Sequence, residues 1–234
     1  MTTRLTEEQV MIQDMAKRFA ADRLAPHTSD WDEQKHFPVD VIKDTAELGF
    51  AGIYVGEDVG GSALGRLDAA LIFEQLSYGD VSTAAFISIH NMASWMIDKF
   101  GSDDQRKAWL PKLTSMDLVA SYCLTEPGSG SDAAAMKTTA VRDGDDYVLN
   151  GSKQFISGAG TSDVYVLMAK TADAGARGVS AFIIPLGTPG LSFGNNEKKM
   201  GWNSQPTRQV MLDDVRVPVA NRIGDEGHGF KFAM

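Results

Sequence analysis

Two short stretches carry the residues whose types and spacing are best suited to chemistry. The first is Gly128-Ser129-Gly130-Ser131, which offers backbone amides that no side chain blocks, together with two hydroxyl donors. Such a loop can cradle a phosphate or pyrophosphate group. Its spacing matches neither GxGxxG nor a phosphate-binding loop that ends in GKS or GKT. A plain surface turn is therefore the simpler interpretation of these four residues alone.

The second stretch is Phe155-Ile156-Ser157, which reads as part of a strand. Alternation along a strand would put Phe155 and Ser157 on one face. An aromatic ring beside a hydroxyl suits a flat heteroaromatic ligand, which would take apolar contact from one and a hydrogen bond from the other. A half-buried strand with a polar edge explains the same residues equally well. Thr125 leaves a predicted strand, so its hydroxyl and amide would face the glycine loop.

The composition is that of a globular chain with excess negative charge. Of 234 residues, 43% are apolar and 23% are charged, and 22 Lys and Arg against 31 Asp and Glu give a net charge of −9. An acidic chain has no global attraction for nucleic acid or for an anionic membrane. An anionic ligand would therefore need a local pocket of amides or cations, and we expect no nucleic-acid or membrane partner.

Cysteine usage and the N-terminal sequence bear on the compartment. Cys123 is the single cysteine, so no internal disulfide can form. The first eight residues lack an apolar signal core and include acids that transit peptides avoid. No apolar run is long enough to span a bilayer. We expect a soluble protein of the cytoplasm, or of the mitochondrial matrix after processing.

The first half of the sequence is predicted to be helical. Thr6 and Ser102 each begin a capping-box pattern, with a glutamine three residues later. The helix over 82–100 is largely apolar, so we place it in the core of a bundle whose short links favour antiparallel packing. The expected helices run from Thr6 to about residue 24, from Pro38 to Gly49, over 66–78, over 82–100, and from Ser102 to about residue 116.

Several residues of this half have a structural interpretation that outweighs a functional one. His90 lies on the apolar helix, and we interpret it as a hydrogen-bonded core histidine. Met92, Trp95 and Met96 on the same helix are interpreted as core residues. The acidic pair at 103–104 is most simply placed at the positive end of a helix dipole.

From about residue 118 the pattern becomes stranded. Asn150-Gly151 is predicted to be a hairpin turn, because both central residues of such a turn favour positive φ. Asp143-Gly144 is a further turn signal. Strands at this spacing, joined by turns without intervening helices, predict an antiparallel barrel or sandwich. The expected strands lie at 119–124, 137–142, 147–149, 153–157, 163–170, 179–185 and 208–212.

The last residues, 221–234, form a glycine-rich loop that leads into the first turn of a helix. A helix this short is not expected to bury its own apolar face or to hold itself together. We therefore expect the chain to be truncated and a further helical domain to be missing. The expected division is an N-terminal α-helical domain at 1–117, a β middle domain at 118–220, and the start of a C-terminal helical domain at 221–234.

Two motifs together resemble the flavin-binding signature of the acyl-CoA dehydrogenases. They are Tyr122-Cys123-Leu124-Thr125-Glu126-Pro127-Gly128-Ser129-Gly130-Ser131-Asp132 and Asn150-Gly151-Ser152-Lys153-Gln154-Phe155-Ile156-Ser157-Gly158-Ala159-Gly160. Residues 199–208 and 214–218 match the family as well, so the resemblance covers nearly the whole chain. It implies a helical N-terminal domain, a β middle domain, and FAD between that domain and a C-terminal helical domain. It implies no metal site.

The resemblance also implies roles for individual positions. Leu124 and Thr125 would hydrogen-bond the pyrimidine side of the flavin. Gly130 and Ser131 would meet the pyrophosphate region, and Ser131 would also contact the CoA part of the substrate. The Ser157 hydroxyl would approach N5, where a fixed donor can steady charge on the reduced flavin. The cofactor-binding positions implied are Tyr122, Cys123, Leu124, Thr125, Gly130, Ser131, Phe155, Ile156 and Ser157.

The family reaction removes two hydrogens from the α and β carbons of an acyl-CoA thioester. A carboxylate takes the α proton, and flavin N5 takes the β hydrogen as hydride. The family base is a glutamate of the C-terminal domain, so we expect no catalytic residue in this chain. Glu126 belongs to the flavin-loop motif and is not a substitute. The resemblance further implies a short branched-chain acyl-CoA substrate of the isobutyryl type, an electron-transfer flavoprotein as acceptor, and a homotetramer.

Two other functions stay open at this point. One is a flavin-dependent oxidase or monooxygenase of the same fold, which a base glutamate in the missing domain would argue against. The other is a stable fragment that binds acyl-CoA or a partner without turnover. Failure to hold FAD while the fold stays intact would favour that function.

Overall fold

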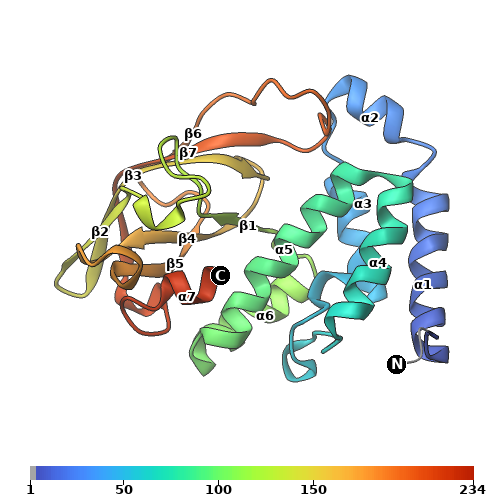
Figure 1. Cartoon of the computed structure of the whole chain (residues 1–234), viewed down its shortest axis with the longest axis horizontal. Helices are drawn as coiled ribbons and strands as arrows, with labels where there is room; N and C mark the ends of the chain where they lie inside the picture. The colour runs from blue at the N-terminus through green and yellow to red at the C-terminus, as the bar shows by residue number, and fades with distance from the viewer. Residues whose placement is uncertain (1–3) are drawn as a thin grey trace.

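The computed structural model describes residues 4–234, which form a helical half and a β half (Figure 1). The helix α1 lies at the outer edge of the helical half, and the strands lie on the opposite side of the molecule. Between them stand α5 and α6. The predicted fold class, a helical bundle followed by a β domain, is confirmed.

Local signals set the ends of the helices. Thr6 Oγ1 accepts a hydrogen bond from the Gln9 backbone N–H (3.2 Å), and the Gln9 side chain accepts one from the Thr6 N–H (3.1 Å). Ser102 and Gln105 form the second predicted capping box. The short helix α2 was not predicted. The helices are α1 (Glu7–Phe19, continued by a π-helical turn at Ala20–Leu24), α2 (Thr28–Gln34), α3 (Val39–Asp44), α4 (Arg66–Gly79), α5 (Val81–Phe100) and α6 (Asp103–Thr114).

The apolar helix α5 joins the helical half to the sheet through His90, which is fully buried. The Ala120 N–H donates to His90 Nδ1 (3.0 Å), so Nε2 carries the ring proton and donates it to the Leu113 carbonyl (3.0 Å). Burial lowers the pKa of His90 to about 4. His90 is therefore a hydrogen-bonded core histidine, as the sequence predicted.

Eight strands form one mixed sheet. Their order is β6-β7-β3-β2-β4-β5-β8, and β1 pairs with β4. Most neighbours are antiparallel, as predicted, but β4 pairs in parallel with both β1 and β2, which the antiparallel expectation did not include. The strands are β1 (Ala120–Cys123), β2 (Thr139–Asp143), β3 (Asp146–Ser157), β4 (Val164–Lys170), β5 (Val179–Pro185), β6 (Leu191–Phe193), β7 (Thr207–Pro218) and β8 (Arg222–Ile223).

The predicted hairpin turn at Asn150-Gly151 is wrong, because β3 runs straight through it. The turn between β2 and β3 lies at the other predicted signal, where Gly144 has φ +63°. Asn150 instead faces two residues of β7 in a β-bulge, and its side chain hydrogen-bonds Asp214 twice, at 2.9 Å each. Gly151 has φ +143°, and a Cβ there would lie 2.6 Å from Thr138 Oγ1. A bulge uses the same residue types as a turn, which explains the error.

The short helix α7 (Gly229–Ala233) corrects another expectation, since it does bury its apolar face. Phe232 is 8% exposed and stacks on Phe100 of α5, with ring centroids 4.0 Å apart. The loop before α7 is fastened to the sheet, because the buried Tyr147 hydroxyl donates to Glu226 Oε1 (2.6 Å) and accepts from Arg222 (2.9 Å). Tertiary packing thus supplies the stability that a five-residue helix lacks alone.

The buried apolar residues form three clusters. One fills the helical half, one lies between α5, α6 and the sheet, and one lies along β3, β4, β5 and β7. The second cluster fixes β1 and the start of the next loop relative to α5. None of the helices within residues 4–234 is long and apolar enough to cross a membrane.

Candidate functional site

The two stretches identified from the sequence meet where β1 ends. The Gln154 N–H in β3 donates to the Thr125 carbonyl (2.7 Å), and Lys153 Nζ donates to the Leu124 carbonyl (3.1 Å). The Ser121 hydroxyl of β1 donates to the Ser157 carbonyl (2.5 Å). The glycine loop that follows β1 is therefore held against the part of β3 that carries Ser157.

A buried ion pair fastens this junction. Lys153 Nζ lies 2.8 Å from Glu126 Oε1, and the Glu126 carboxylate also accepts the backbone N–H groups of Lys137 (2.6 Å) and Thr138 (3.0 Å). Burial alone would raise the pKa of Glu126, but the Lys153 charge and these hydrogen bonds outweigh it and lower the pKa. Burial lowers the pKa of Lys153. Glu126 is therefore an ionised structural group that is already held by one cation and two backbone N–H donors.

The glycine loop is shaped by one of its serines and leaves the other free. Ser129, whose hydroxyl was predicted as a possible ligand donor, is buried and donates that proton to the Asp132 carbonyl instead (2.6 Å). Ser131 is exposed. A Cβ added at Gly128 or Gly130 would meet no atom within 4 Å, and neither glycine has positive φ. The fold itself thus does not require glycine at these positions, whereas a ligand approaching the backbone would.

Phe155 lies in a second β-bulge, which the predicted alternation did not include. Gln154 and Phe155 together face a single residue of β7, and Phe155 has φ +59° and is 61% exposed. Ile156 returns to the core, and Ser157 lies half-buried beyond it. The exposed Phe155 ring and the Ser157 hydroxyl therefore both lie at the end of β3, but the bulge breaks the simple alternation that was predicted to place them on one face.

The side chains of the remaining predicted positions divide between the core and the site. Cys123 and Ile156 are buried in the sheet core, so any contact with a ligand must use their backbone atoms. Burial raises the pKa of the Cys123 thiol, which makes it a poor nucleophile. Tyr122 and Leu124 are half-buried and pack on the cluster beneath α5 and α6.

Sequence reasoning missed a segment that completes the site. Residues 194–206 connect β6 to β7 and extend from the sheet to α2 (Figure 1). Gln205, near the end of this segment, donates its Nε2–H to Ser157 Oγ at 2.6 Å. Residues 199–208 were recognised only as a matching motif, because sequence separation from Ser157 hides this contact.

The arrangement can bind a flat heteroaromatic group joined to phosphate. Within residues 4–234, no group of the chain accepts the N–H of Gly130 or Ser131. The buried Tyr122 hydroxyl and Gln205 Oε1 have no hydrogen-bond partner in the described structure, although buried polar groups almost always have one. Free amides at an open glycine loop suit a pyrophosphate, and an exposed ring beside a hydroxyl suits a flavin.

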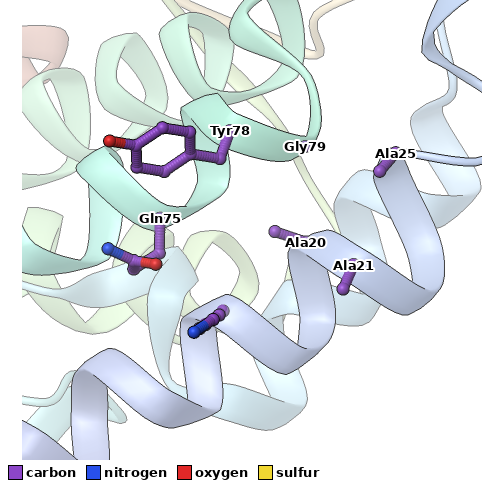
Figure 2. A pocket seen from close by; sticks show the side chains of 7 residues that line it. Ala20, Ala21, Ala25, Gln75, Tyr78 and Gly79 are labelled. Atoms are coloured by element: carbon purple, nitrogen blue, oxygen red, sulfur yellow. The ribbon is translucent and has the colours of Figure 1, made fainter.

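A pocket in the helical half lacks this chemistry. A surface pocket of about 420 Å³ lies between α1, its π-helical turn and α4 (Figure 2). It is lined largely by small residues, together with Gln75 and Tyr78 of α4 and with Lys17 of α1. It belongs to the helical edge farthest from the sheet. No three metal-ligating side chains gather anywhere in the described part of the chain.

The fold and this site define a flavoprotein. Residues 6–117 match the N-terminal domain of acyl-CoA dehydrogenase, and residues 121–215 match its middle domain. The chain belongs to the acyl-CoA dehydrogenase family, a family of enzymes whose cofactor is FAD.

Individual relatives refine this assignment. The mitochondrial isobutyryl-CoA dehydrogenase of Bos taurus is 57% identical over 98% of this chain and 55% of its own length. The butyryl-CoA dehydrogenase of Megasphaera elsdenii has a TM-score of 0.94 at 34% identity, covering 100% of this chain and 62% of that one. The structure of PigA with FAD and proline has a TM-score of 0.95 at 36% identity, covering 99% and 62%. The chain thus spans about half the length of the curated relatives it matches.

Proposed function

We propose that this chain forms the FAD-binding face of an acyl-CoA dehydrogenase. The observation that carries the proposal is the buried Glu126–Lys153 pair, which joins an open glycine loop to the strand that bears Ser157. The loop carries the backbone amides of Gly130 and Ser131, and the strand carries the exposed Phe155 ring and the Ser157 hydroxyl.

We assign the cofactor contacts as the family resemblance implies. Leu124 and Thr125 bind the pyrimidine side of the flavin, and Gly130 and Ser131 bind the pyrophosphate, with Ser131 also on the CoA chain. Phe155 and Ile156 lie beside the ring, as do Tyr122 and Cys123. FAD supplies the hydride acceptor for the β hydrogen of the substrate. Ser157 donates its hydroxyl proton toward N5, and the donation strengthens as negative charge builds there.

For the whole protein we propose α,β-dehydrogenation of a short branched-chain acyl-CoA of the isobutyryl type. The 57% identity to isobutyryl-CoA dehydrogenase supports this substrate. We assign the base that takes the α proton to no residue of this chain. Glu126, the carboxylate of the flavin-loop motif, is already bound by Lys153 and by two backbone amides.

The remaining assignments rest on the resemblance. We propose that an electron-transfer flavoprotein accepts the electrons, that the protein forms a homotetramer, and that it works in the cytoplasm or the mitochondrial matrix. We keep the domain division at 1–117, 118–220 and 221–234 as part of the same proposal. Sedimentation velocity of the whole protein tests the proposed tetramer.

The experiment that tests the proposal is cofactor retention. The purified chain is incubated with FAD, desalted, and its visible spectrum recorded, with riboflavin in a parallel sample. We expect a retained flavin band from FAD and none from riboflavin, which lacks the pyrophosphate. Equal retention of both, or retention of neither by a folded chain, would contradict the proposed site.

A second step tests the assignment of the base. Isobutyryl-CoA is added to the FAD-loaded chain without oxygen. We expect no bleaching of the flavin band, because we assign the base to no residue of this chain. Bleaching would show that this chain contains its own base.

A further inference from the structure

The segment 194–206 ties the helical half to the candidate site. Asp32 of α2 accepts two hydrogen bonds from Asn203, one from the backbone N–H (2.6 Å) and one from the side-chain Nδ2 (3.0 Å). The hydrogen bonds of Asn203 lower the pKa of Asp32, so this carboxylate is ionised at neutral pH. Figure 1 shows the segment spanning the space above the sheet to reach α2.

A lysine holds the end of this segment in a tight curl. Lys199 Nζ donates to the carbonyls of Trp202 (2.6 Å) and Gln205 (2.7 Å) and to Thr207 Oγ1 (2.9 Å). These three acceptors are spaced along six residues, so one ammonium group fixes the path of the chain from Trp202 into β7. Asn203 and Gln205 are therefore parts of one rigid unit, anchored at one end on α2.

The other end of this unit, Gln205, determines whether the Ser157 hydroxyl donates or accepts a hydrogen bond. Gln205 is 3% exposed, and its Nε2–H donates to Ser157 Oγ at 2.6 Å. A serine hydroxyl has one proton and two acceptor lone pairs. Because Ser157 accepts from Gln205, its own proton is left to donate to a group outside the chain. A glutamine in the reversed orientation, or a carboxylate, would instead take that proton.

We propose that Gln205 is a positioning residue that orients the Ser157 hydroxyl as a donor toward the flavin, and that Asp32 in the helical half fixes Gln205 through Asn203. This inference rests on the proposed function, because it assumes that Ser157 faces the cofactor. It adds a residue pair from two distant parts of the chain to the site. It also gives α2 a role in cofactor chemistry although α2 lies outside the flavin-binding motifs.

The buried amide oxygen of Gln205 supports a role beyond packing. Gln205 Oε1 is buried and has no hydrogen-bond partner within the described residues. An unpaired buried acceptor is costly, and an apolar side chain of similar size would avoid that cost. The glutamine is accounted for if its Nε2–H is needed at Ser157.

The first experiment needs no cofactor. In the ¹⁵N-labelled chain, the Gln205 side-chain amide is assigned by its loss in Gln205→Met. We expect that amide to exchange slowly with solvent, to shift in Ser157→Ala, and to exchange at least tenfold faster in Asp32→Ala. Asp30→Ala, on the same helix at an exposed position, is the matched control and should leave it unchanged. An unchanged exchange rate of the Gln205 side-chain amide in Asp32→Ala would overturn the link to α2.

The second experiment measures a property of the bound cofactor, its reduction potential. We compare the midpoint potential of bound FAD in the wild-type chain with that in Ser157→Ala, Gln205→Met and Gln205→Glu. Loss of one donor at N5 should shift the preference for reduced over oxidised FAD about tenfold, or about 30 mV lower for a two-electron couple. We expect both Gln205 variants to shift as Ser157→Ala does. A wild-type potential in both, while Ser157→Ala is shifted, would overturn the positioning role.

The two experiments separate this inference from the proposed function. If the wild-type chain binds no FAD, the proposed function fails, yet the amide measurement still decides whether Asp32 fixes Gln205. If FAD binds and only the Gln205 variants behave as wild type, the proposed function stands and the positioning role is rejected. Circular dichroism of each variant excludes unfolding as the cause of a shift.

Discussion

Lys153 Nζ and Glu126 Oε1 lie 2.8 Å apart with side chains that are 0% and 5% exposed, and this pair unites the candidate site. Glu126 belongs to the loop after β1, and Lys153 lies four residues before Ser157 in β3. Two charges removed from water are tolerated only when each is neutralised and hydrogen-bonded. The backbone amides of Lys137 and Thr138 complete that requirement and tie a third piece of chain to the pair.

The first prediction concerns this pair. Lys153→Met leaves the Glu126 carboxylate buried without its cation, so we expect the free energy of unfolding to fall by about 3–5 kcal/mol. Urea unfolding followed by circular dichroism measures the change. The double variant Lys153→Met/Glu126→Gln removes both charges and should recover at least half of the loss. A double variant as unstable as the single one would contradict this account of the pair.

The second prediction concerns the close approach of α5 to the end of β3. Gly158 has φ +77°, and a Cβ there would lie 2.5 Å from the Phe86 ring and 2.6 Å from Ser162 Oγ. Gly187 also has positive φ (+83°), but a Cβ there would meet nothing within 4 Å. We expect Gly187→Ala to cost about 1 kcal/mol from backbone strain, and Gly158→Ala to cost roughly 1–3 kcal/mol more from overpacking. Equal losses in urea unfolding would show that no clash exists.

Local sequence signals predicted much of the fold, because the interactions behind them join residues that are close together in the sequence. The capping boxes at Thr6 and Ser102 need only four consecutive residues, and both are present. His90 was placed correctly because a polar ring on a helix that is apolar all round is buried, and a buried polar ring has to be hydrogen-bonded. The family resemblance placed the stretches around Thr125 and Ser157 beside one flavin, and the structure joins the two stretches through the Gln154–Thr125 hydrogen bond.

Errors arose where a distant partner decides the local structure. Asn150-Gly151 has the composition of a turn, but β7 pairs along the whole of β3 and converts the dipeptide into a bulge. Burial of Lys153 could not be predicted, since lysine is ordinarily exposed and Glu126 lies 27 residues away in the sequence. The contact of Gln205 with Ser157 spans 48 residues and had no local signal.

The third prediction concerns pH. The folded pKa of His90, about 4, lies below its ordinary value of 6.5, so the unfolded chain binds this proton more readily. The stability that neutral His90 provides is complete above about pH 6.5 and is lost as the pH falls toward 4, at a cost of about 3 kcal/mol. Other groups titrate in this range, so wild type is compared with His90→Gln at pH 7 and pH 4.5. The wild type should lose more stability than the variant, and parallel losses would contradict the prediction.

The last prediction separates ligand binding from folding at the glycine loop. Gly130 lacks positive φ, and a Cβ there meets no atom of the chain, so Gly130→Ala should unfold within about 0.5 kcal/mol of wild type. A pyrophosphate resting on the loop backbone would meet the added methyl group, so we expect FAD retention after desalting to fall at least tenfold. Gly144→Ala, at the β2–β3 turn where an added Cβ likewise meets no atom within 4 Å, is the control and should retain FAD although its positive φ costs about 1 kcal/mol. If Gly130→Ala held FAD as tightly as wild type, the loop would be a surface turn, and the pyrophosphate would have to bind elsewhere.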